Sequence, residues 1–219
     1  MEAYISRMLK QGFDTGHLPI RLHGIPDGLP KEKSPSDTLY QLVVLIRVTK
    51  SMGPPLQELL NQFNKTEETH VSCVVYNFML WWVGRLGKEL HIPAYISYPM
   101  VPSFYSYLLR IPGFASQARL PLGTHTDLSN VSNIFKIPSF PALHVSEVPD
   151  VLYRESAILV CSFDYVLCCT VRWRDATIVL LNTVYKLEKE AVEGLKEMGP
   201  ELDIKAVGPT LPASFQRGR

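Results

Sequence analysis

The chain has 219 residues, of which 46% are hydrophobic and 20% charged, and its formal net charge is +1. This size is sufficient to bury one substantial core, so we expect a globular protein of one domain or two small ones. The near-zero charge provides no basic field for a phosphate polymer or an anionic bilayer, which disfavours nucleic acid and membrane partners relative to a small molecule or a protein.

The cysteines and the apolar runs indicate a reducing compartment. The four cysteines are Cys73, Cys161, Cys168 and Cys169. They form no CxxC pair and no zinc-ligand spacing with histidine, so we expect buried, reduced thiols and no metal. No basic-then-apolar signal sequence opens the chain, and the longest apolar run is too short to span a bilayer. We therefore expect a cytoplasmic protein without a membrane span.

The first third of the chain predicts one short strand and then helices. Residues 19–25 are typical of an edge strand, followed by a Pro-Asp-Gly turn at 26–28. Apolar residues then recur at helical spacing in 39–46 and again in 56–63, which predicts two helices or one bent helix. The Gly-Pro-Pro sequence at 53–55 separates them, and prolines suit only a first helical turn.

Strands and helices alternate in the middle of the chain. Residues 71–76 form a nearly continuous apolar run, the pattern of a strand covered on both faces. Residues 81–90 predict a helix, 93–98 the next strand, and 103–109 the start of an aromatic-rich helix. This alternation predicts an α/β fold, with a Rossmann-like parallel sheet and helices on both faces.

The C-terminal part predicts one irregular segment and then a βαβ unit. Residues 111–155 are rich in Pro, Ser and Thr, which indicates a surface excursion or a pocket-lining loop. Residues 154–174 return to a helical pattern. Residues 176–209 then run from an apolar strand through a turn and an amphipathic helix to a second strand that ends at Val207-Gly208-Pro209.

Four segments, taken together and in this order, resemble the plant-type family 1 UDP-glycosyltransferases. They are IPDGLP (25–30), CVVYNFMLWWVGRLGKELHIPA (73–94), IPSFPALHVSEVPDVL (137–152) and LLNTVYKLEKEAVEGLKE with IKAVGP (180–209). The resemblance implies a partial N-terminal, acceptor-binding lobe of the two-lobed GT-B fold at 1–212, followed by a tail at 213–219. It also implies that the family's first strand or strands and its C-terminal donor lobe are missing.

The family transfers a hexose from a UDP-sugar, with inversion, to a hydroxyl of a small lipophilic acceptor such as a flavonoid or other phenolic. A positioned base must take the proton of that hydroxyl, and in this family the base is a His after the first strand. None of the six histidines of this chain occupies that turn. The resemblance thus implies a transferase fragment that is inactive alone, has no cofactor, and uses a UDP-sugar as co-substrate only when the missing lobe is supplied.

Asn77 is the candidate catalytic residue. The resemblance places it where most family members have the Asp that orients the His, at a strand end where open α/β sheets bind ligands. An Asn can accept the imidazole N–H hydrogen bond but cannot offset the charge that grows on the ring, so weaker catalysis is expected. Capping of the following helix is an equally open role for this side chain.

Aromatic and thioether side chains after two strand ends are predicted to form an apolar wall for the acceptor. Packing of helices onto the sheet is the alternative role for each of them. The resemblance also implies that Pro99 replaces a Ser or Thr that touches the donor. The predicted acceptor-binding residues are Phe78, Met79, Trp81, Tyr98, Pro99, Met100 and Phe104.

A hypothesis of another class remains open. The chain would then be a non-catalytic module, derived from a glycosyltransferase, that binds an apolar small molecule or a partner protein. In either case a parallel sheet without a central strand exposes unpaired backbone groups, so self-association through the sheet edge is expected.

Overall fold

The computed structural model of this chain describes residues 23–26, 46–47, 49–116, 134–135, 143–144, 165–166 and 168–208. The chain divides into two compact units, residues 1–70 and residues 71–219. In the first unit, helix α3 (Gly53–Phe63) begins with prolines in its first turn, as residues 53–55 predict. The turn η1 (Glu67–Thr69) follows it.

The strand predicted at 19–25 is wrong for its described part. Residues 23–26 have no regular structure, and Gly24 and Pro26 belong to the residue types that strands disfavour. The His23 ring instead meets the Phe63 ring edge-on, with 5.1 Å between centroids. Residues 19–22 and the rest of the predicted turn lie outside the described residues.

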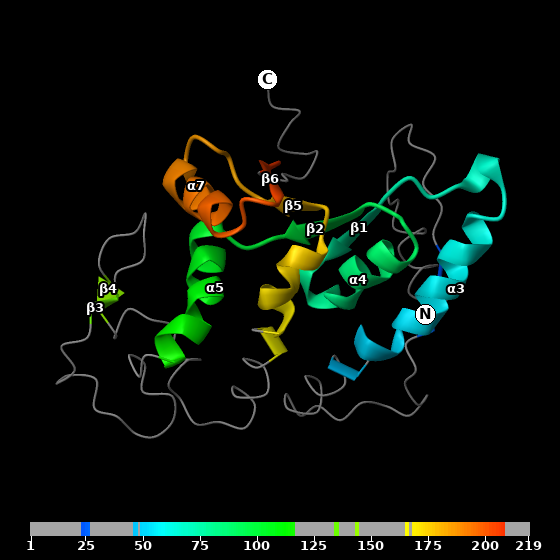
Figure 1. Ribbon diagram of the computed structural model, residues 1–219, viewed down its shortest axis with the longest axis horizontal. Helices are drawn as coiled ribbons and strands as arrows, with labels where there is room; N and C mark the ends of the chain where they lie inside the picture. Colours follow the sequence, from blue (N-terminus) through cyan, green and yellow to red (C-terminus); the bar gives the residue numbers. More distant parts are fainter. Residues whose placement is uncertain are drawn as a thin grey trace, which may run out of the picture. The chain divides into compact units, whose positions relative to one another are not determined.

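The second unit is built on a four-stranded parallel sheet (Figure 1). Its strands are β1 (Val74–Asn77), β2 (Ala94–Tyr98), β5 (Ile178–Leu181) and β6 (Asp203–Ala206), hydrogen-bonded in the order β1-β2-β5-β6. All three neighbouring pairs are parallel. The predicted α/β class and parallel sheet are therefore confirmed.

Helical elements connect these strands. The turn η2 (Phe78–Leu80) and helix α4 (Trp82–Glu89) follow β1, and helix α5 (Pro102–Ser116) follows β2. A helical segment over residues 165–171, of which residue 167 is not described, leads into the turn η6 (Arg172–Asp175) before β5. Helix α7 (Lys189–Met198) joins β5 to β6, which confirms the predicted βαβ unit.

The segment predicted as irregular, 111–155, is partly regular. Helix α5 continues to Ser116 through Pro112 and Gly113, although both residues disfavour a helix interior. Residue propensity alone therefore does not predict where this helix ends. A small antiparallel pair, β3 (Ile134–Phe135) and β4 (Leu143–His144), also lies in this segment.

One face of the sheet forms the core. Tyr76, Ile96, Val179 and Ile204 are paired in register across all four strands, and all four are buried. Helices α4 and α5 cover this face, because Gly84 of α4 lies against Tyr76 and Tyr105 of α5 stacks on Tyr98. The second face is less covered, and Val75 of β1 is 59% exposed. Helices were predicted on both faces, and the contacts that place α4 and α5 belong to the core face.

A chain of four aromatic rings fixes α5 and η6 onto the core face. The Phe78 and Tyr98 rings are 4.7 Å apart, Tyr98 stacks on Tyr105 at 3.7 Å, and Tyr105 meets Trp173 edge-on at 5.6 Å. All four side chains are buried. Aromatic pairs of this kind stabilise a core by about 0.5–1.5 kcal/mol each beyond their buried area.

Helix α4 ends in a tight turn that begins β2. His91 has a φ of 56°, and the amides of Ile92 and His91 donate to the carbonyls of Gly87 and Lys88. This pattern is a Schellman motif. A Cβ on Gly87 would lie 2.8 Å from the Ala94 Cβ and 2.8 Å from the Ile92 carbonyl oxygen. Only glycine therefore allows α4 to approach β2 this closely.

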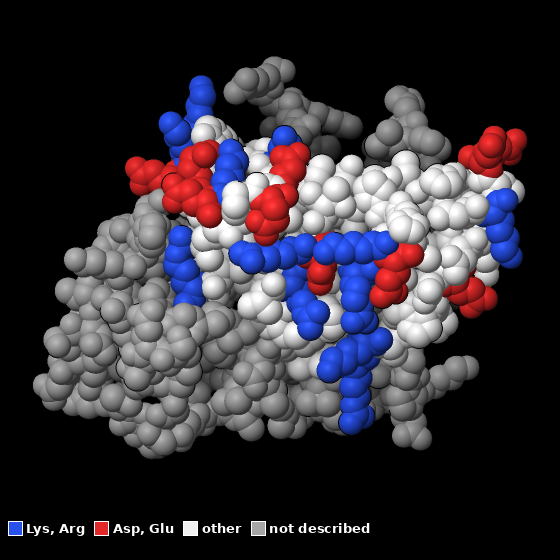
Figure 2. Space-filling model, viewed as in Figure 1, with Lys and Arg blue, Asp and Glu red and all other residues white. Residues whose placement is uncertain are grey.

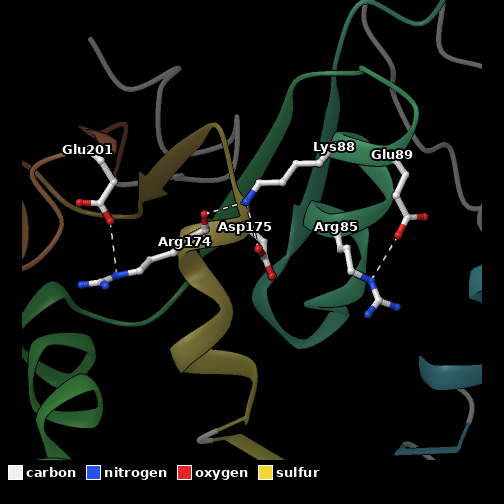
Figure 3. A network of polar contacts seen from close by, with 6 residues as sticks. All are labelled: Arg85, Lys88, Glu89, Arg174, Asp175 and Glu201. Carbon is white, nitrogen blue, oxygen red and sulfur yellow. Dashed lines mark hydrogen bonds and ion pairs between the residues drawn. The ribbon is translucent and has the colours of Figure 1, made fainter.

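Ion pairs join α4 to η6 at the surface (Figure 3). The Lys88 ammonium lies 3.0 Å from an Asp175 carboxylate oxygen and donates to the Arg174 carbonyl at 3.2 Å. Arg174 pairs in turn with Glu201, at 3.4 Å, ahead of β6. Because Lys88, Arg174 and Glu201 are more than half exposed, each pair contributes at most about 1 kcal/mol.

Replacement of the Tyr105 phenol tests the aromatic core. The Tyr105 hydroxyl is buried without a hydrogen-bond partner among the described residues, so Tyr105→Phe should leave the free energy of unfolding at neutral pH unchanged or raise it by up to about 1 kcal/mol. Burial first, and the neighbouring Tyr98 and Tyr76 next, raise the pKa of Tyr105 well above its ordinary value. Urea unfolding monitored by circular dichroism measures the change.

The same variant has an expected pH dependence. A raised folded-state pKa means that the neutral phenol stabilises the fold fully below the unfolded pKa of about 10, and that this contribution falls as the pH rises above it. Tyr105→Phe should therefore lose less stability than the parent chain on going to about pH 11. Tyr95→Phe, on the other sheet face, is the control. Destabilisation of Tyr105→Phe by more than about 1 kcal/mol at neutral pH would contradict this description.

Candidate functional site

The candidate site lies at the carboxyl edge of the parallel sheet, where each strand ends and the segment after it begins. Asn77 ends β1, Pro99 follows β2, Thr183 follows β5 and Gly208 follows β6. Parallel strands bring all their carboxyl ends to the same edge, which is where open α/β sheets bind ligands. Residues more than 100 positions apart in the chain thus meet along one line.

Asn77 acts as a helix cap in this structure. Its backbone is extended, and its side-chain Oδ1 accepts a hydrogen bond from the Met79 amide at 3.0 Å. The capping role is therefore confirmed, whereas the catalytic role stays a prediction. The residue is exposed at the carboxyl edge of the sheet.

The predicted acceptor-wall residues divide into two groups. Phe78 and Tyr98 lie in the buried aromatic chain, and burial also raises the pKa of the Tyr98 phenol, which keeps it neutral. The others are at least partly accessible, and they are Met79, Trp81, Pro99, Met100 and Phe104. An acceptor role stays a prediction for both groups, and the accessible group is the one that a ligand can contact without opening the core.

Local contacts orient some of the accessible residues. The Met79 carbonyl accepts a hydrogen bond of 2.7 Å from the Tyr165 hydroxyl, which ties the segment after β1 to the helical residues 165–171. The Arg172 guanidinium lies over the Trp81 ring, 4.9 Å from its centroid. The Phe104 ring is 6.4 Å from that of Tyr107. The first contact fixes the backbone at Met79, and the other two restrict the Trp81 and Phe104 rings.

No strand of the sheet has a described histidine at its carboxyl end. His91 precedes β2, so it belongs to the opposite, amino end of the sheet. His23 and His70 lie in the other unit, and His144 is in β4. His17 and His125 lie outside the described residues. Among the described histidines, none is therefore placed beside Asn77 in the sheet.

Sequence reasoning missed a carboxylate at the edge. Glu188, just before α7, accepts hydrogen bonds from the Thr183 hydroxyl at 2.5 Å and the Ser103 hydroxyl at 3.2 Å. The Ser103 amide points to the same carboxylate at 3.5 Å. These contacts join the loop after β5 to the start of α5, and a separation of 85 residues left no local signal for them.

Gly208 closes the edge at β6. Its amide donates to the Thr183 carbonyl at 3.0 Å. A Cβ at this position would lie 2.5 Å from the Asn182 Oδ1 and 2.6 Å from the Thr183 amide nitrogen. The glycine in the Val207-Gly208 sequence is therefore required by the close approach of two loops.

The described residues contain no metal-binding cluster. Acidic and basic side chains both lie on the face seen in Figure 2. No group of three or more His, Cys, Asp or Glu side chains in the described part of the chain could hold a metal ion. Cys73, Cys168 and Cys169 are free thiols, and burial raises the pKa of Cys169 to about 12. Cys161 lies outside the described residues.

None of the described helices combines the length and the hydropathy that crossing a bilayer requires.

Two substitutions of Asn77 test its capping role, one that removes the side-chain oxygen and one that keeps it but adds a charge. Asn77→Ala should lower the free energy of unfolding by about 0.5–2 kcal/mol, because the Met79 amide loses its acceptor, whereas Asn77→Asp should keep the cap and the stability. Urea unfolding of both variants measures the difference. Equal stability of the Ala and Asp variants would contradict the capping role.

Comparison with known proteins identifies the relatives of this chain. No protein-family model matches it. UDP-glycosyltransferase 84A3 of Arabidopsis thaliana is 26% identical over 159 residues, which are 70% of this chain and 31% of that protein. Mogroside I-E synthase of Siraitia grosvenorii is 24% identical over 205 residues, which are 90% of this chain and 39% of that enzyme.

Solved structures with the same fold come from the same class of enzyme. A Polygonum tinctorium UDP-glucosyltransferase capable of glucosylating indoxyl superposes with a TM-score of 0.67 at 18% identity, over 89% of this chain and 41% of that one. Phytolacca americana UGT2, solved with UDP-2fluoro-glucose and pterostilbene, gives a TM-score of 0.64 at 15% identity, over 78% and 37%. The chain thus spans about two fifths or less of the length of these relatives. The resemblance seen in its sequence is confirmed, and the chain is a relative of the plant UDP-glycosyltransferases with the fold of the N-terminal lobe of a GT-B enzyme.

Proposed function

We propose that this chain is the acceptor-binding part of a glycosyltransferase that moves a hexose, with inversion, from a UDP-sugar to a hydroxyl of a small lipophilic acceptor. The observation that supports this function is the carboxyl edge of the parallel sheet, where Asn77 and the accessible Pro99 and Met100 follow neighbouring strands. The bound pterostilbene of the Phytolacca relative favours a flavonoid or another phenolic as the acceptor class.

The residues of this chain would bind and orient the acceptor. Apolar side chains at the edge exclude water from one face of an aromatic ring and bring its hydroxyl toward Asn77. Transfer also needs a base for the hydroxyl proton, and no described histidine is placed beside Asn77 in the sheet. We therefore assign binding and orientation to this chain, proton removal and UDP-sugar binding to parts beyond the described site, and no transfer activity to the chain alone. A cytoplasmic location is part of the same proposal.

A non-catalytic binding module is the second candidate. The amide of Asn77, in the place of a carboxylate, favours it, because a neutral side chain cannot offset an imidazolium charge. The Oδ1 of Asn77 is also already engaged with the Met79 amide. Both candidates share the acceptor site, and they differ in whether a complete two-lobed protein that contains this chain transfers sugar.

Binding and transfer assays on the purified chain test the proposal. Kaempferol should quench its tryptophan fluorescence saturably, with a dissociation constant of about 10–100 µM, because a partly built site supports only modest affinity. UDP-glucose alone should not bind. With both present, mass spectrometry should detect no glucoside above a heat-denatured control. Absence of saturable quenching would contradict the acceptor site, and a glucoside would contradict the inactivity of the chain.

Self-association through the outer edge of β1 is also expected. Among the described strands β1 pairs only with β2, so its other side presents unpaired backbone groups beside the exposed Val75. Sedimentation velocity should find dimers or larger species that grow with concentration. Val75→Lys should weaken the association, because a charge on a strand edge opposes pairing, whereas Val171→Lys, at another exposed valine, should not. A monomer at every concentration would overturn this expectation.

A further inference from the structure

Helix α5 begins without a capping side chain of its own. Pro102 is its first residue, and Val101 before it offers no side-chain hydrogen-bond acceptor. The amides of a first helical turn have no partner within the helix, and they need an acceptor from elsewhere. The amide of Ser103 belongs to this group.

The carboxylate of Glu188 supplies the missing hydrogen-bond acceptor. One of its oxygens lies 3.2 Å from the Ser103 hydroxyl and 3.5 Å from the Ser103 amide, and the other accepts from the Thr183 hydroxyl at 2.5 Å. Glu188 is itself the N-cap residue of α7, yet its side chain makes no capping bond to that helix. A negative charge at the start of α5 is also favourable for the dipole of that helix. Glu188 thus caps a helix that begins 86 positions earlier in the chain.

These bonds fix the segment that carries Pro99 and Met100. At its first end the Tyr98 carbonyl accepts a hydrogen bond of 3.2 Å from the Asn182 amide. At its other end Ser103 is held by Glu188. Residues 99–101, together with Pro102 at the start of α5, are therefore held at both ends by the loop after β5. Pro99 and Val101 are exposed and Met100 is half-buried, so burial in the core does not hold this segment in place.

We propose that Glu188 is a positioning residue for acceptor recognition, which sets the 99–101 segment at the distance from Asn77 that an aromatic acceptor requires. This inference rests on the proposed function of the carboxyl edge. Glu188 contacts neither acceptor nor donor, and it acts through the α5 N-terminus. Without the carboxylate, the 99–101 segment would have to be ordered when an acceptor binds, and that ordering reduces affinity.

Variants at residue 188 test the hydrogen bonds by which Glu188 joins the loop after β5 to the start of α5. Glu188→Ala removes these bonds and should weaken kaempferol binding about tenfold. Fluorescence quenching measures the binding, under conditions where circular dichroism finds every variant folded. Glu188→Gln should remain within about twofold of the parent chain, because its carbonyl can accept from Ser103 and its amide can donate to the Thr183 hydroxyl. Glu190→Ala, at an exposed glutamate in the first turn of α7, is the matched control and should bind as the parent does.

A double-mutant cycle assigns the effect to the contact itself. Ser103→Ala should weaken kaempferol binding by less than Glu188→Ala, and the double variant should bind no more weakly than Glu188→Ala alone, because both changes remove the same bond. Additive losses would show that the two residues act separately, and would overturn the proposal.

Amide hydrogen exchange provides a readout that needs no bound acceptor molecule such as kaempferol. In Glu188→Ala the peptide over 99–105 should exchange its amides faster than in the parent chain, and in Glu188→Gln and Glu190→Ala it should not. If the parent chain fails to bind kaempferol, the proposed function fails, and the exchange data still decide whether Glu188 holds the segment. If the parent chain binds but Glu188→Ala binds equally well, or Glu188→Gln loses as much as Glu188→Ala, the positioning role is wrong.

Discussion

The parallel pairing of β2 with β1 on one side and β5 on the other is the interaction on which the rest of the second unit depends. Tyr76, Ile96 and Val179 share one row of this ladder, and all three strands end at the same edge of the sheet. Parallel pairing leaves no alternative to long crossover connections, so helical structure follows β1, β2 and β5 before the next strand of the sheet begins. The candidate site is a direct product of this arrangement, because only aligned strand ends bring Asn77, Pro99 and Thr183 together.

The aromatic chain on the core face sets a limit on what the site can use. Phe78 and Tyr98 follow or end strands at the edge, as ligand-binding residues would, but their rings are needed to hold α5 and η6 onto the sheet. Tyr98 is fully buried. A ligand that used either ring would have to displace core contacts. The neighbouring Pro99 and Met100 are accessible, so a ligand could contact them without displacing the core.

The elements that could be predicted from the sequence are those whose signal is local. The βαβ unit at 176–209 was predicted because its apolar period changes from two to 3.6 and back within one short stretch. The predicted strand at 71–76 was placed within three residues of β1, since an apolar run marks a strand more clearly than its boundaries. The continuation of α5 beyond Pro112 was not predictable, because Pro112 and Gly113 are residue types that disfavour a helix interior. The capping by Glu188 was not predictable, because it joins residues 85 positions apart. The burial of Phe78 and Tyr98 was equally undecided, since an aromatic residue at a strand end suits a core and a pocket alike.

The alternation of buried and half-buried residues along β2 has a consequence for how this chain can misfold. Ala94, Ile96 and Tyr98 are buried while Tyr95 and Ser97 lie on the less covered face, and the Ala94 amide donates to the Thr177 hydroxyl at the start of the ladder. A slip of the strand by one residue would bring Ser97 into the core and place Pro93, which has no amide hydrogen, where Ala94 donates. A shift in this direction is thus penalised twice, by desolvation of a hydroxyl and by a missing donor. A shift in the other direction places Ser97 at the buried position of Ile96, so the observed alignment of the central strand is the one that avoids both penalties.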